Sequence, residues 1–299
     1  WASSPRYSCD VLIERVCRRS ARELGKVLTD AQITQYREEG FVSPIDILSE
    51  QEAGRYLQRF EEAERRYPTL AHSHRRNNVH LSFKCLDELA HHPVILDAVE
   101  DLIGAHFSLW ATVLFCKEPE SPHYVSWHQD ATYMGMSHTE FVTPWLALTP
   151  SNVATGCMQM IPGSHLHDIL EHEDTYAEDN ILTRGQKAKG VDETAAVDLL
   201  LKPGQMSLHH AKVLHGSRPN TTMQRRVGFA MQSYMPPHVE QVVGKNLWLE
   251  VRGINDRQNS QRLHRPEYDA DPVAAADREQ ADANLDDILY RGAAQKRGY

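Results

Sequence analysis

The chain has 299 residues, of which 41% are hydrophobic and 24% charged, a composition that supports a sizeable core and excludes collagen-like and disordered classes. Its net charge of −9 and the lack of a long basic run argue against nucleic acid or an anionic membrane as a partner. The five cysteines show no C-x-x-C spacing and no apolar stretch is long enough to span a bilayer, so we expect reduced thiols in a soluble cytoplasmic protein.

The N-terminal third is predicted to be helical, after an extension that we leave out of the fold. Residues 1–27 are rich in Arg and Ser and lack an initiator Met, which fits a processed leader, a tag remnant or a short amphipathic helix. Apolar residues recur at helical spacing in 28–40, 49–66 and 93–102. The signals that begin and end these helices are capping boxes and glycines: Thr29 with Gln32, Ser49 with Glu52, Gly40 and Gly104.

After Gly104 the sequence changes to short runs rich in Val, Phe, Trp and Thr, separated by Pro and Gly turns. The expected strands are 107–115, 124–130, 141–148, 157–161, 196–201, 205–209 and 226–234. Such closely spaced runs favour an antiparallel β-sandwich or barrel over alternating β–α units. Pro144, inside one run, predicts an edge strand or a bulge there, because proline lacks a backbone donor.

Two further segments complete the predicted organisation. Residues 165–191 are polar and glycine-containing, and we expect them to form an insertion over one mouth of the barrel. Residues 266–299 are rich in Ala, Asp and Glu, which predicts a C-terminal helix followed by a loose tail. The main domain is therefore expected to span 28–265.

The strongest local pattern is Trp127-His128-Gln129-Asp130. Side chains alternate along a strand, so His128 and Asp130 are expected to face the same cavity. An imidazole and a carboxylate are two of the three ligands of a 2-His-1-carboxylate site, which suits Fe(II) and leaves positions open for oxygen chemistry. Because H-x-D also occurs by chance, the hypothesis needs a second histidine from elsewhere.

A later run supplies that histidine and introduces a family resemblance. His215-Gly216-Ser217-Arg218-Pro219-Asn220 is followed by Arg226, and 156–165 reads G-C-x-x-x-x-P-G-S-H. Together with H-x-D, these ordered motifs resemble the phytanoyl-CoA dioxygenase family of Fe(II)/2-oxoglutarate oxygenases over residues 28–265. The doublet His209-His210 competes for the ligand role, and we interpret His210 as a supporting or structural neighbour.

The resemblance implies a mainly β protein with flanking helices around a double-stranded β-helix, a cupin-like jelly roll. It implies that His128, Asp130 and His215 are the catalytic metal ligands and hold Fe(II). It also implies that 2-oxoglutarate and O2 are consumed, with release of succinate and CO2. Halogenating relatives have a small residue where this chain has Asp130, so the resemblance implies hydroxylation rather than chlorination.

By the same resemblance, the distal carboxylate of 2-oxoglutarate meets Arg226 and Ser217, with further cosubstrate contacts at Val113 and Trp145. A buried carboxylate is costly to desolvate unless a guanidinium meets it, and Arg225 competes for that role. Strand parity separates the two arginines. Arg226 shares its face with small or polar residues, Gly228, Ala230 and Gln232, whereas Arg225 shares its face with Val227, Phe229 and Met231. We therefore assign the role to Arg226.

The substrate is expected to be a small polar metabolite: an amino acid, a phosphonate or a natural-product intermediate. The net charge of −9 disfavours a polyanionic CoA thioester. Candidate substrate-binding residues are Gln129, Thr132 and Tyr133 beside the metal strand, and Arg184 in the predicted insertion, where it would clamp an anionic group together with Lys187. The oligomeric state is left open.

Two other functions compete with this hypothesis. The same ligands suit Zn(II) and a hydrolytic reaction, although hydrolysis has no use for Arg226 and Ser217. A non-catalytic jelly-roll binding module would use His128 and Asp130 as hydrogen-bonded core residues, but such a module has no need for a complete ligand set.

Overall fold

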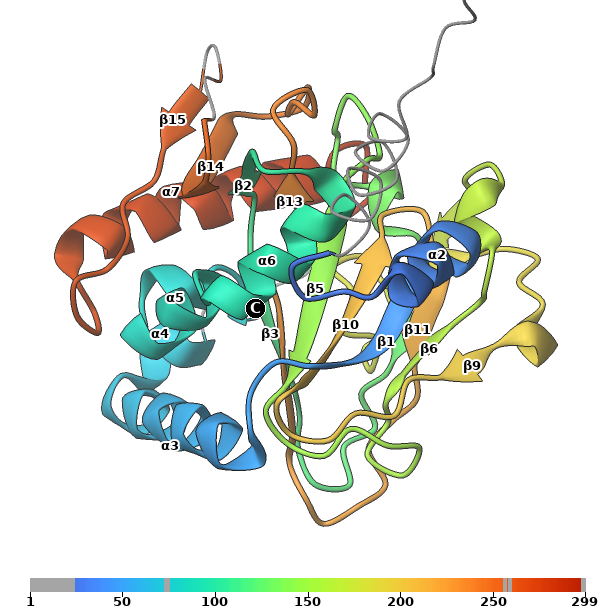
Figure 1. The fold of residues 1–299 in the computed structure, drawn as a ribbon, viewed down its shortest axis with the longest axis horizontal. Helices are drawn as coiled ribbons and strands as arrows, with labels where there is room; N and C mark the ends of the chain where they lie inside the picture. Colours follow the sequence, from blue (N-terminus) through green and yellow to red (C-terminus); the bar gives the residue numbers. More distant parts are fainter. Residues whose placement is uncertain (1–24, 73–75, 255–256, 258–259, 297–299) are drawn as a thin grey trace, which may run out of the picture.

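Two β-sheets lie face to face and form a barrel, and helices cover one side of this barrel (Figure 1). This computed structural model describes residues 25–72, 76–254, 257 and 260–296. The arrangement is the predicted double-stranded β-helix, or jelly roll. Strand pairs in the described residues are antiparallel, as expected, except for one parallel pair at an edge of the larger sheet.

The strands fall into three sheets. The larger sheet contains β1 (Phe41–Asp46), β2 (Phe107–Leu109), β3 (Val113–Lys117), β5 (Val142–Ala147), β10 (Gln205–His210), β12 (Arg226–Ala230), β13 (Tyr234–Met235), β14 (Asn246–Arg252) and β15 (Ser260–Arg262). The smaller sheet contains β4 (Val125–His128), β6 (Met158–Met160), β9 (Val197–Asp198) and β11 (His215–Ser217). A separate hairpin pairs β7 (His172–Asp174) with β8 (Gln186–Ala188).

The described residues contain six α-helices, and the three expected in the N-terminal third form close to their predicted limits. The six helices are α2 (Asp30–Glu39), α3 (Glu50–Arg66), α4 (Pro68–His72), α5 (Lys84–Ala90), α6 (Pro93–Ile103) and α7 (Pro272–Leu289), with 3-10 turns η2 (Val79–Leu81), η3 (Asp130–Thr132), η4 (Ser164–Leu166) and η5 (Glu193–Ala195). Thr29 and Ser49 each form a complete capping box with the residue three positions on. No helix in the described part of the chain is long and apolar enough to cross a membrane.

The main core lies between the helices and the outer face of the larger sheet. Phe60 of α3 packs edge-on against Phe83, with ring centroids 6.1 Å apart, and both side chains are fully buried. From the sheet, Val227 and Phe229 of β12 point into this core. Since side chains alternate along a strand, the intervening residues of β12 face the opposite way, into the space between the sheets.

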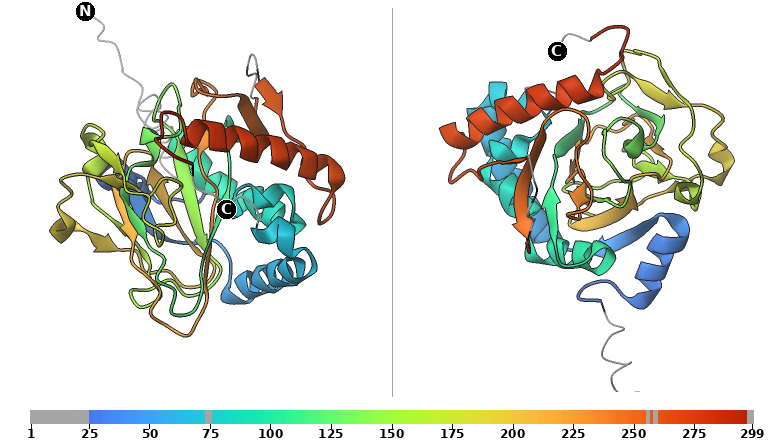
Figure 2. Two further views of the ribbon diagram at one scale, coloured as in Figure 1. Left: turned by 180° about the vertical axis from the view of Figure 1, so that it is seen from behind. Right: turned by 90° about the horizontal axis from the view of Figure 1, so that it is seen from above.

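Helix α7 is tied firmly to the N-terminal helical segment. Its Arg278 guanidinium donates to the Leu70 carbonyl at 2.7 Å and to Ser82 Oγ at 2.8 Å. Asn78 donates to the Asp282 carboxylate at 2.8 Å. Both views in Figure 2 show α7 running along the same side of the barrel as α3 to α6. The predicted C-terminal helix is therefore packed against the body of the protein.

Several predicted strand limits are wrong. The run 107–115 divides into β2 and β3, because the Thr112 N–H turns to the side chain of Asn78. The run 226–234 divides into β12 and β13, and only Val197–Asp198 of the run 196–201 is a strand. Pro144 lies in β5, which pairs with β10 on one side and with β12 and β13 on the other, so it is not on an edge.

The cysteine prediction is tested at three positions. Cys85, Cys116 and Cys157 are free thiols. Cys9 and Cys17, with most of the predicted 1–27 extension, lie outside the described residues.

Candidate metal and cosubstrate site

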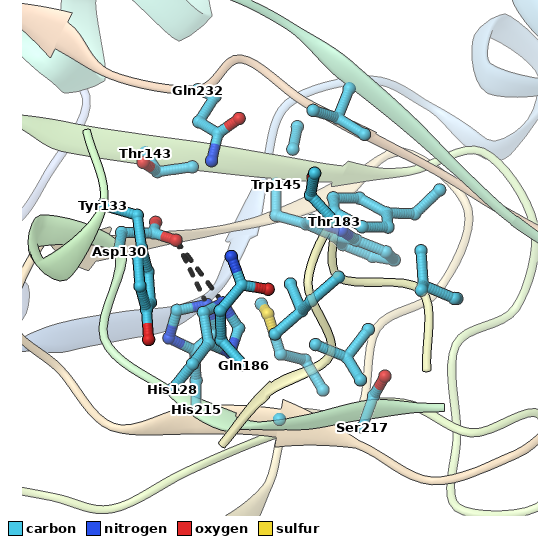
Figure 3. A pocket seen from close by; sticks show the side chains of 18 of the residues that line it. His128, Asp130, Tyr133, Thr143, Trp145, Thr183, Gln186, His215, Ser217 and Gln232 are labelled. Atoms are coloured by element: carbon cyan, nitrogen blue, oxygen red, sulfur yellow. Dashed lines mark ion pairs between the residues drawn. The ribbon is translucent and has the colours of Figure 1, made fainter. Parts of the chain in front are cut away.

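The three predicted metal ligands converge at one end of a cavity between the sheets (Figure 3). His128 ends β4 and is the cross-strand partner of His215, which begins β11. The Asp130 Oδ1 atom lies 3.5 Å from His128 Nε2 and 3.9 Å from His215 Nε2. One ligand atom from each of these buried residues lies within 4.8 Å of the others. This spacing allows all three side chains to bind one metal ion.

Asp130 reaches this position from a turn rather than from a strand, which corrects the predicted strand 124–130. Strand β4 ends at His128, and Asp130 begins the 3-10 turn η3. Gln129 between them keeps an extended backbone, with φ −124° and ψ 124°. The alternation of side chains therefore persists for one more residue, and His128 and Asp130 still face the same cavity.

The hydrogen bonds of the two histidines leave the correct nitrogen for a metal. His128 Nδ1 lies 2.9 Å from the Ser126 carbonyl, and His215 Nδ1 lies 3.0 Å from the Val213 carbonyl. A carbonyl only accepts, so Nδ1 carries the proton in both rings and Nε2 keeps its lone pair. Both Nε2 atoms face Asp130, and this donor set fits Fe(II) with positions left for further ligands.

The electrostatics of the site favour the ionisation states that metal binding needs. Burial, together with the nearby His128, lowers the pKa of His215 to about 3, so this imidazole is neutral near pH 7. Burial alone would raise the pKa of Asp130, but the surrounding imidazoles outweigh it and hold that pKa well below its usual range. The site thus presents neutral histidine and a carboxylate.

His209 is a third histidine at the site. It lies on β10 of the larger sheet, lines the cavity and is 2% exposed. Its Nε2 atom lies 3.6 Å from Asp130 Oδ2, whereas the two predicted ligands lie nearer to Oδ1. His209 thus lies next to the carboxylate oxygen that is farther from the two predicted histidine ligands. His210, its neighbour, accepts a hydrogen bond from the Lys212 N–H and does not line the cavity.

Arg226 lines the cavity from the larger sheet, as strand parity predicts. The side chain is 2% exposed and lines the cavity, and its Nη1 donates to the Gly156 carbonyl at 3.0 Å. Its Nε has no partner among the described residues. Burial lowers its pKa to about 10. A buried guanidinium with a spare donor is suited to an anionic ligand.

The other residues predicted to contact the cosubstrate also line the cavity. They are Val113 on β3, Trp145 on β5 and Ser217 on β11. The Arg226 guanidinium lies 5.1 Å from the Trp145 ring centroid. A Cβ atom at Gly228 would approach the Trp145 ring to 1.9 Å, so only glycine leaves room for that ring.

The predicted substrate residues are divided by the structure. Tyr133 lines the cavity and stands beside Asp130 in Figure 3. Thr132 does not line it, and neither does Gln129, whose side-chain amide is hydrogen-bonded to the Lys212 carbonyl and the Leu170 N–H. Arg184 also lies outside the lining; its Nε atom is 3.3 Å from Asp174 Oδ1, and its guanidinium lies 4.7 Å from the Tyr133 ring centroid.

The predicted insertion does cover the cavity, but with other residues. Its apolar and neutral members that line the cavity are Ile181, Leu182, Thr183 and Gln186. The Thr183 carbonyl accepts a hydrogen bond from Tyr290, directly after α7, at 3.3 Å. Gln232 lines the cavity, as expected from the face that it shares with Arg226, but the sequence patterns missed lining residues from distant segments: Asn77, Trp110, Leu285 and Leu289. None of these stands in a motif, so only the tertiary structure reveals them.

Comparison with known proteins agrees with this geometry. A family profile described as "Phytanoyl-CoA dioxygenase (PhyH)" matches residues 36–228. A Stutzerimonas stutzeri protein named "Probable alpha-ketoglutarate-dependent hypophosphite dioxygenase" is 27% identical over 224 residues, 73% of each chain. A Streptomyces arenae protein named "1-deoxypentalenic acid 11-beta-hydroxylase" is 29% identical over 149 residues, 46% of this chain and 51% of its own.

Solved structures share the fold. One described as "non-heme monooxygenase; ThoJ apo" is 34% identical, with a TM-score of 0.78 over 87% of this chain and 98% of its own. The segment that matches the family profile contains His128, Asp130, His215 and Arg226.

Proposed function

The chain belongs to the phytanoyl-CoA dioxygenase family of Fe(II)/2-oxoglutarate-dependent oxygenases, and from this premise we propose that it hydroxylates a small metabolite in the cavity between its sheets. The observation that carries the proposal is the convergence of His128, Asp130 and His215 opposite a buried guanidinium. That guanidinium, on Arg226, has no carboxylate partner among the described residues.

Each residue has a defined task in this proposal. His128, Asp130 and His215 hold Fe(II), and Arg226 with Ser217 binds the distal carboxylate of 2-oxoglutarate. When bound, iron, 2-oxoglutarate and O2 supply the oxidation: one oxygen atom enters a C–H bond of the substrate, and the other leaves in succinate with release of CO2. The protein positions the two organic molecules and excludes water.

The lining of the cavity favours one of the expected substrate classes. Among the described residues, the cavity is lined by no Lys or Glu, by no Arg other than Arg226 and by no Asp other than Asp130. Trp110, Leu182 and Leu289 provide apolar contacts, and Asn77, Tyr133 and Gln232 provide neutral polar ones. A natural-product intermediate with an apolar skeleton and a few polar groups fits these side chains better than a free amino acid or a phosphonate.

Anaerobic titration tests the core of the proposal. Adding Fe(II) and then 2-oxoglutarate to the protein should produce the weak visible charge-transfer band of a chelated cosubstrate. His215→Ala should abolish the band, and His210→Ala should retain it, because His210 lies outside the cavity. Metal-loaded wild-type protein without the band would contradict the assignment.

A substrate screen tests the rest. Natural-product acids, free amino acids, phosphonates, sugar phosphates and acyl-CoA thioesters are compared for substrate-dependent succinate release and an oxygenated product. A hit among compounds with an apolar skeleton is expected. Hits confined to acyl-CoA thioesters would contradict the proposed substrate class and leave the oxygenase assignment standing.

A further inference from the structure

A second buried cation lies directly beside Arg226. Lys117 on β3 is the cross-strand partner of Arg226 on β12, and its side chain is fully buried. Like charges directly opposite each other on neighbouring strands destabilise a sheet. No carboxylate of the described residues lies within ion-pair distance of either cation. Neither basic side chain of this pair therefore has a compensating anion among the described residues.

The residues next to the ends of these two strands show the opposite arrangement. Arg225 and Glu118, each one position along the chain, form an ion pair at 2.9 Å, and Arg225 also pairs with Glu64 at 2.8 Å. Charges on the outward face are thus neutralised by acids, whereas those on the inward face are not. Buried charges that serve only the fold are normally paired with an acid of the protein. Because Arg226 and Lys117 have no such acid, we interpret them as a site for an anionic ligand.

The hydrogen bonds of Lys117 connect it to the cavity wall. Its Nζ donates to Ser217 Oγ at 2.7 Å and to the Gly156 carbonyl at 3.3 Å, and it also donates to the Arg218 carbonyl. The Gly156 carbonyl is shared with Arg226. When Lys117 is protonated, Ser217 Oγ accepts from it and the Ser217 hydroxyl proton is turned away from the lysine. Ser217 itself lines the cavity.

Resting on the proposed placement of 2-oxoglutarate, we propose that Lys117 is a positioning residue for its distal carboxylate. Lys117 directs the Ser217 hydroxyl proton toward that carboxylate and places a second positive charge below it. The carboxylate then compensates both cations at once, which favours 2-oxoglutarate over 2-oxo acids that lack the distal group.

A pair of ligands tests this in Fe(II)-loaded protein under anaerobic conditions. Binding of 2-oxoglutarate and of 2-oxopentanoate, which has a methyl group in place of the distal carboxylate, is measured by calorimetry. Lys117→Met should weaken 2-oxoglutarate binding about tenfold or more. It should change 2-oxopentanoate binding by less than about twofold. Equal losses for both ligands, or no loss for either, would overturn the proposal.

Two further variants identify the route of the effect. Glu118→Gln, on the outward face next to Lys117, should leave both affinities unchanged. Ser217→Ala combined with Lys117→Met should weaken 2-oxoglutarate binding by less than the sum of the single effects, because the lysine acts partly through the hydroxyl. Fully additive effects would contradict the positioning role.

Proton uptake by the wild-type protein tests the proposal even where Lys117→Met fails to fold. The titratable groups that face Lys117 are Arg226 on β12 and Cys157 before β6. Burial, reinforced by the charge of Arg226, lowers the pKa of Lys117 to about 6, while burial raises the pKa of the Cys157 thiol to about 11. At pH 8 the free protein therefore holds Lys117 largely neutral, and an arriving carboxylate recharges it.

Calorimetry in two buffers of different ionisation enthalpy should then show uptake of about one proton more with 2-oxoglutarate than with 2-oxopentanoate. Equal proton uptake would overturn the role of Lys117. A wild-type protein that does not prefer 2-oxoglutarate would instead contradict the carboxylate placement in the proposed function, so the two failures are distinguishable.

Discussion

Two adjacent arginines illustrate how side-chain parity on one strand divides structure from function. Arg225 faces outward and joins β12 to α3 through Glu64, whose carboxylate also pairs with Arg76 at 2.6 Å. Burial would raise the pKa of Glu64, but hydrogen bonds from both arginines lower it to about 2. Arg226 faces inward and has no such acid among the described residues. The first arginine stabilises the fold, and the second is available to a ligand.

Replacing each arginine in turn should separate these roles. Arg226→Ala should weaken 2-oxoglutarate binding by roughly 2 to 5 kcal/mol, because a buried carboxylate loses its charged partner. Arg225→Ala should weaken that binding by less than about 1 kcal/mol. It should instead lower the free energy of unfolding, since it removes the ion pairs to Glu64 and Glu118. Equal effects of the two variants on cosubstrate affinity would show that the assignment by parity is mistaken.

Residues were predictable from sequence where a short motif fixes them. His128 and Asp130 are two positions apart, and an extended backbone places them on one side whether or not the strand continues. Arg184 shows the limit of this reasoning. Its charge suggested a substrate clamp, but its guanidinium forms an ion pair with Asp174 and a cation–π contact with the Tyr133 ring. Neither neighbour belongs to a motif with Arg184, so its environment depends on how the β7–β8 hairpin folds.

At the scale of elements, the cavity is closed by two segments that meet each other. Ile181, Leu182 and Thr183 line it from the insertion, and Leu285 and Leu289 line it from α7. The two are joined by hydrogen bonds from Tyr290 to Thr183 and from Arg184 to the Arg291 carbonyl, both at 3.3 Å. The predicted cosubstrate residues come from the sheets. From this division we predict that the insertion and α7 determine substrate selectivity.

A truncation in α7 tests that division. Leu289→Ala should lower kcat/KM for the substrate found in the screen, with a loss of transition-state stabilisation of about 1 to 3 kcal/mol, because the substrate loses apolar contact. The affinity for 2-oxoglutarate should not change. Val273→Ala is the matched control, since Val273 is on the same helix and 55% exposed. A Leu289→Ala variant that loses cosubstrate affinity, or a control that loses as much kcat/KM, would contradict this assignment.

Elements were predictable where local signals are strong and unreliable where pairing decides. Both capping boxes form as predicted, because their hydrogen bonds are local. Pro144 was expected on an edge strand or at a bulge; it is not on an edge, but lies in central β5 where the neighbouring strand changes from β12 to β13. The backbone N–H that Pro144 lacks would lie at this change of neighbouring strand. Strands β1, β11 and β14 were not predicted, because their place in the sheets depends on pairing with distant strands.

At the scale of the whole molecule, the two sheets carry complementary parts of the site. The smaller sheet and the turn after it provide the predicted metal ligands, and the larger sheet provides Arg226 and Trp145. The many short strands made an antiparallel sandwich or barrel predictable, and the family resemblance implied the jelly roll. The place of α7 was not, because Leu285 and Leu289 reach the cavity only through packing far from the motifs.

A cosubstrate that bridges both sheets should stabilise the whole fold. Ligand that binds only the folded state at 100 times its dissociation constant adds about 2.7 kcal/mol to the free energy of unfolding. Anaerobic denaturant unfolding of Fe(II)-loaded protein, with and without 2-oxoglutarate, measures this gain. Arg226→Ala at the same 2-oxoglutarate concentration should lose most of it, because weaker binding lowers the occupancy. If the variant keeps the full gain, the cosubstrate does not join the iron ligands of one sheet to Arg226 of the other.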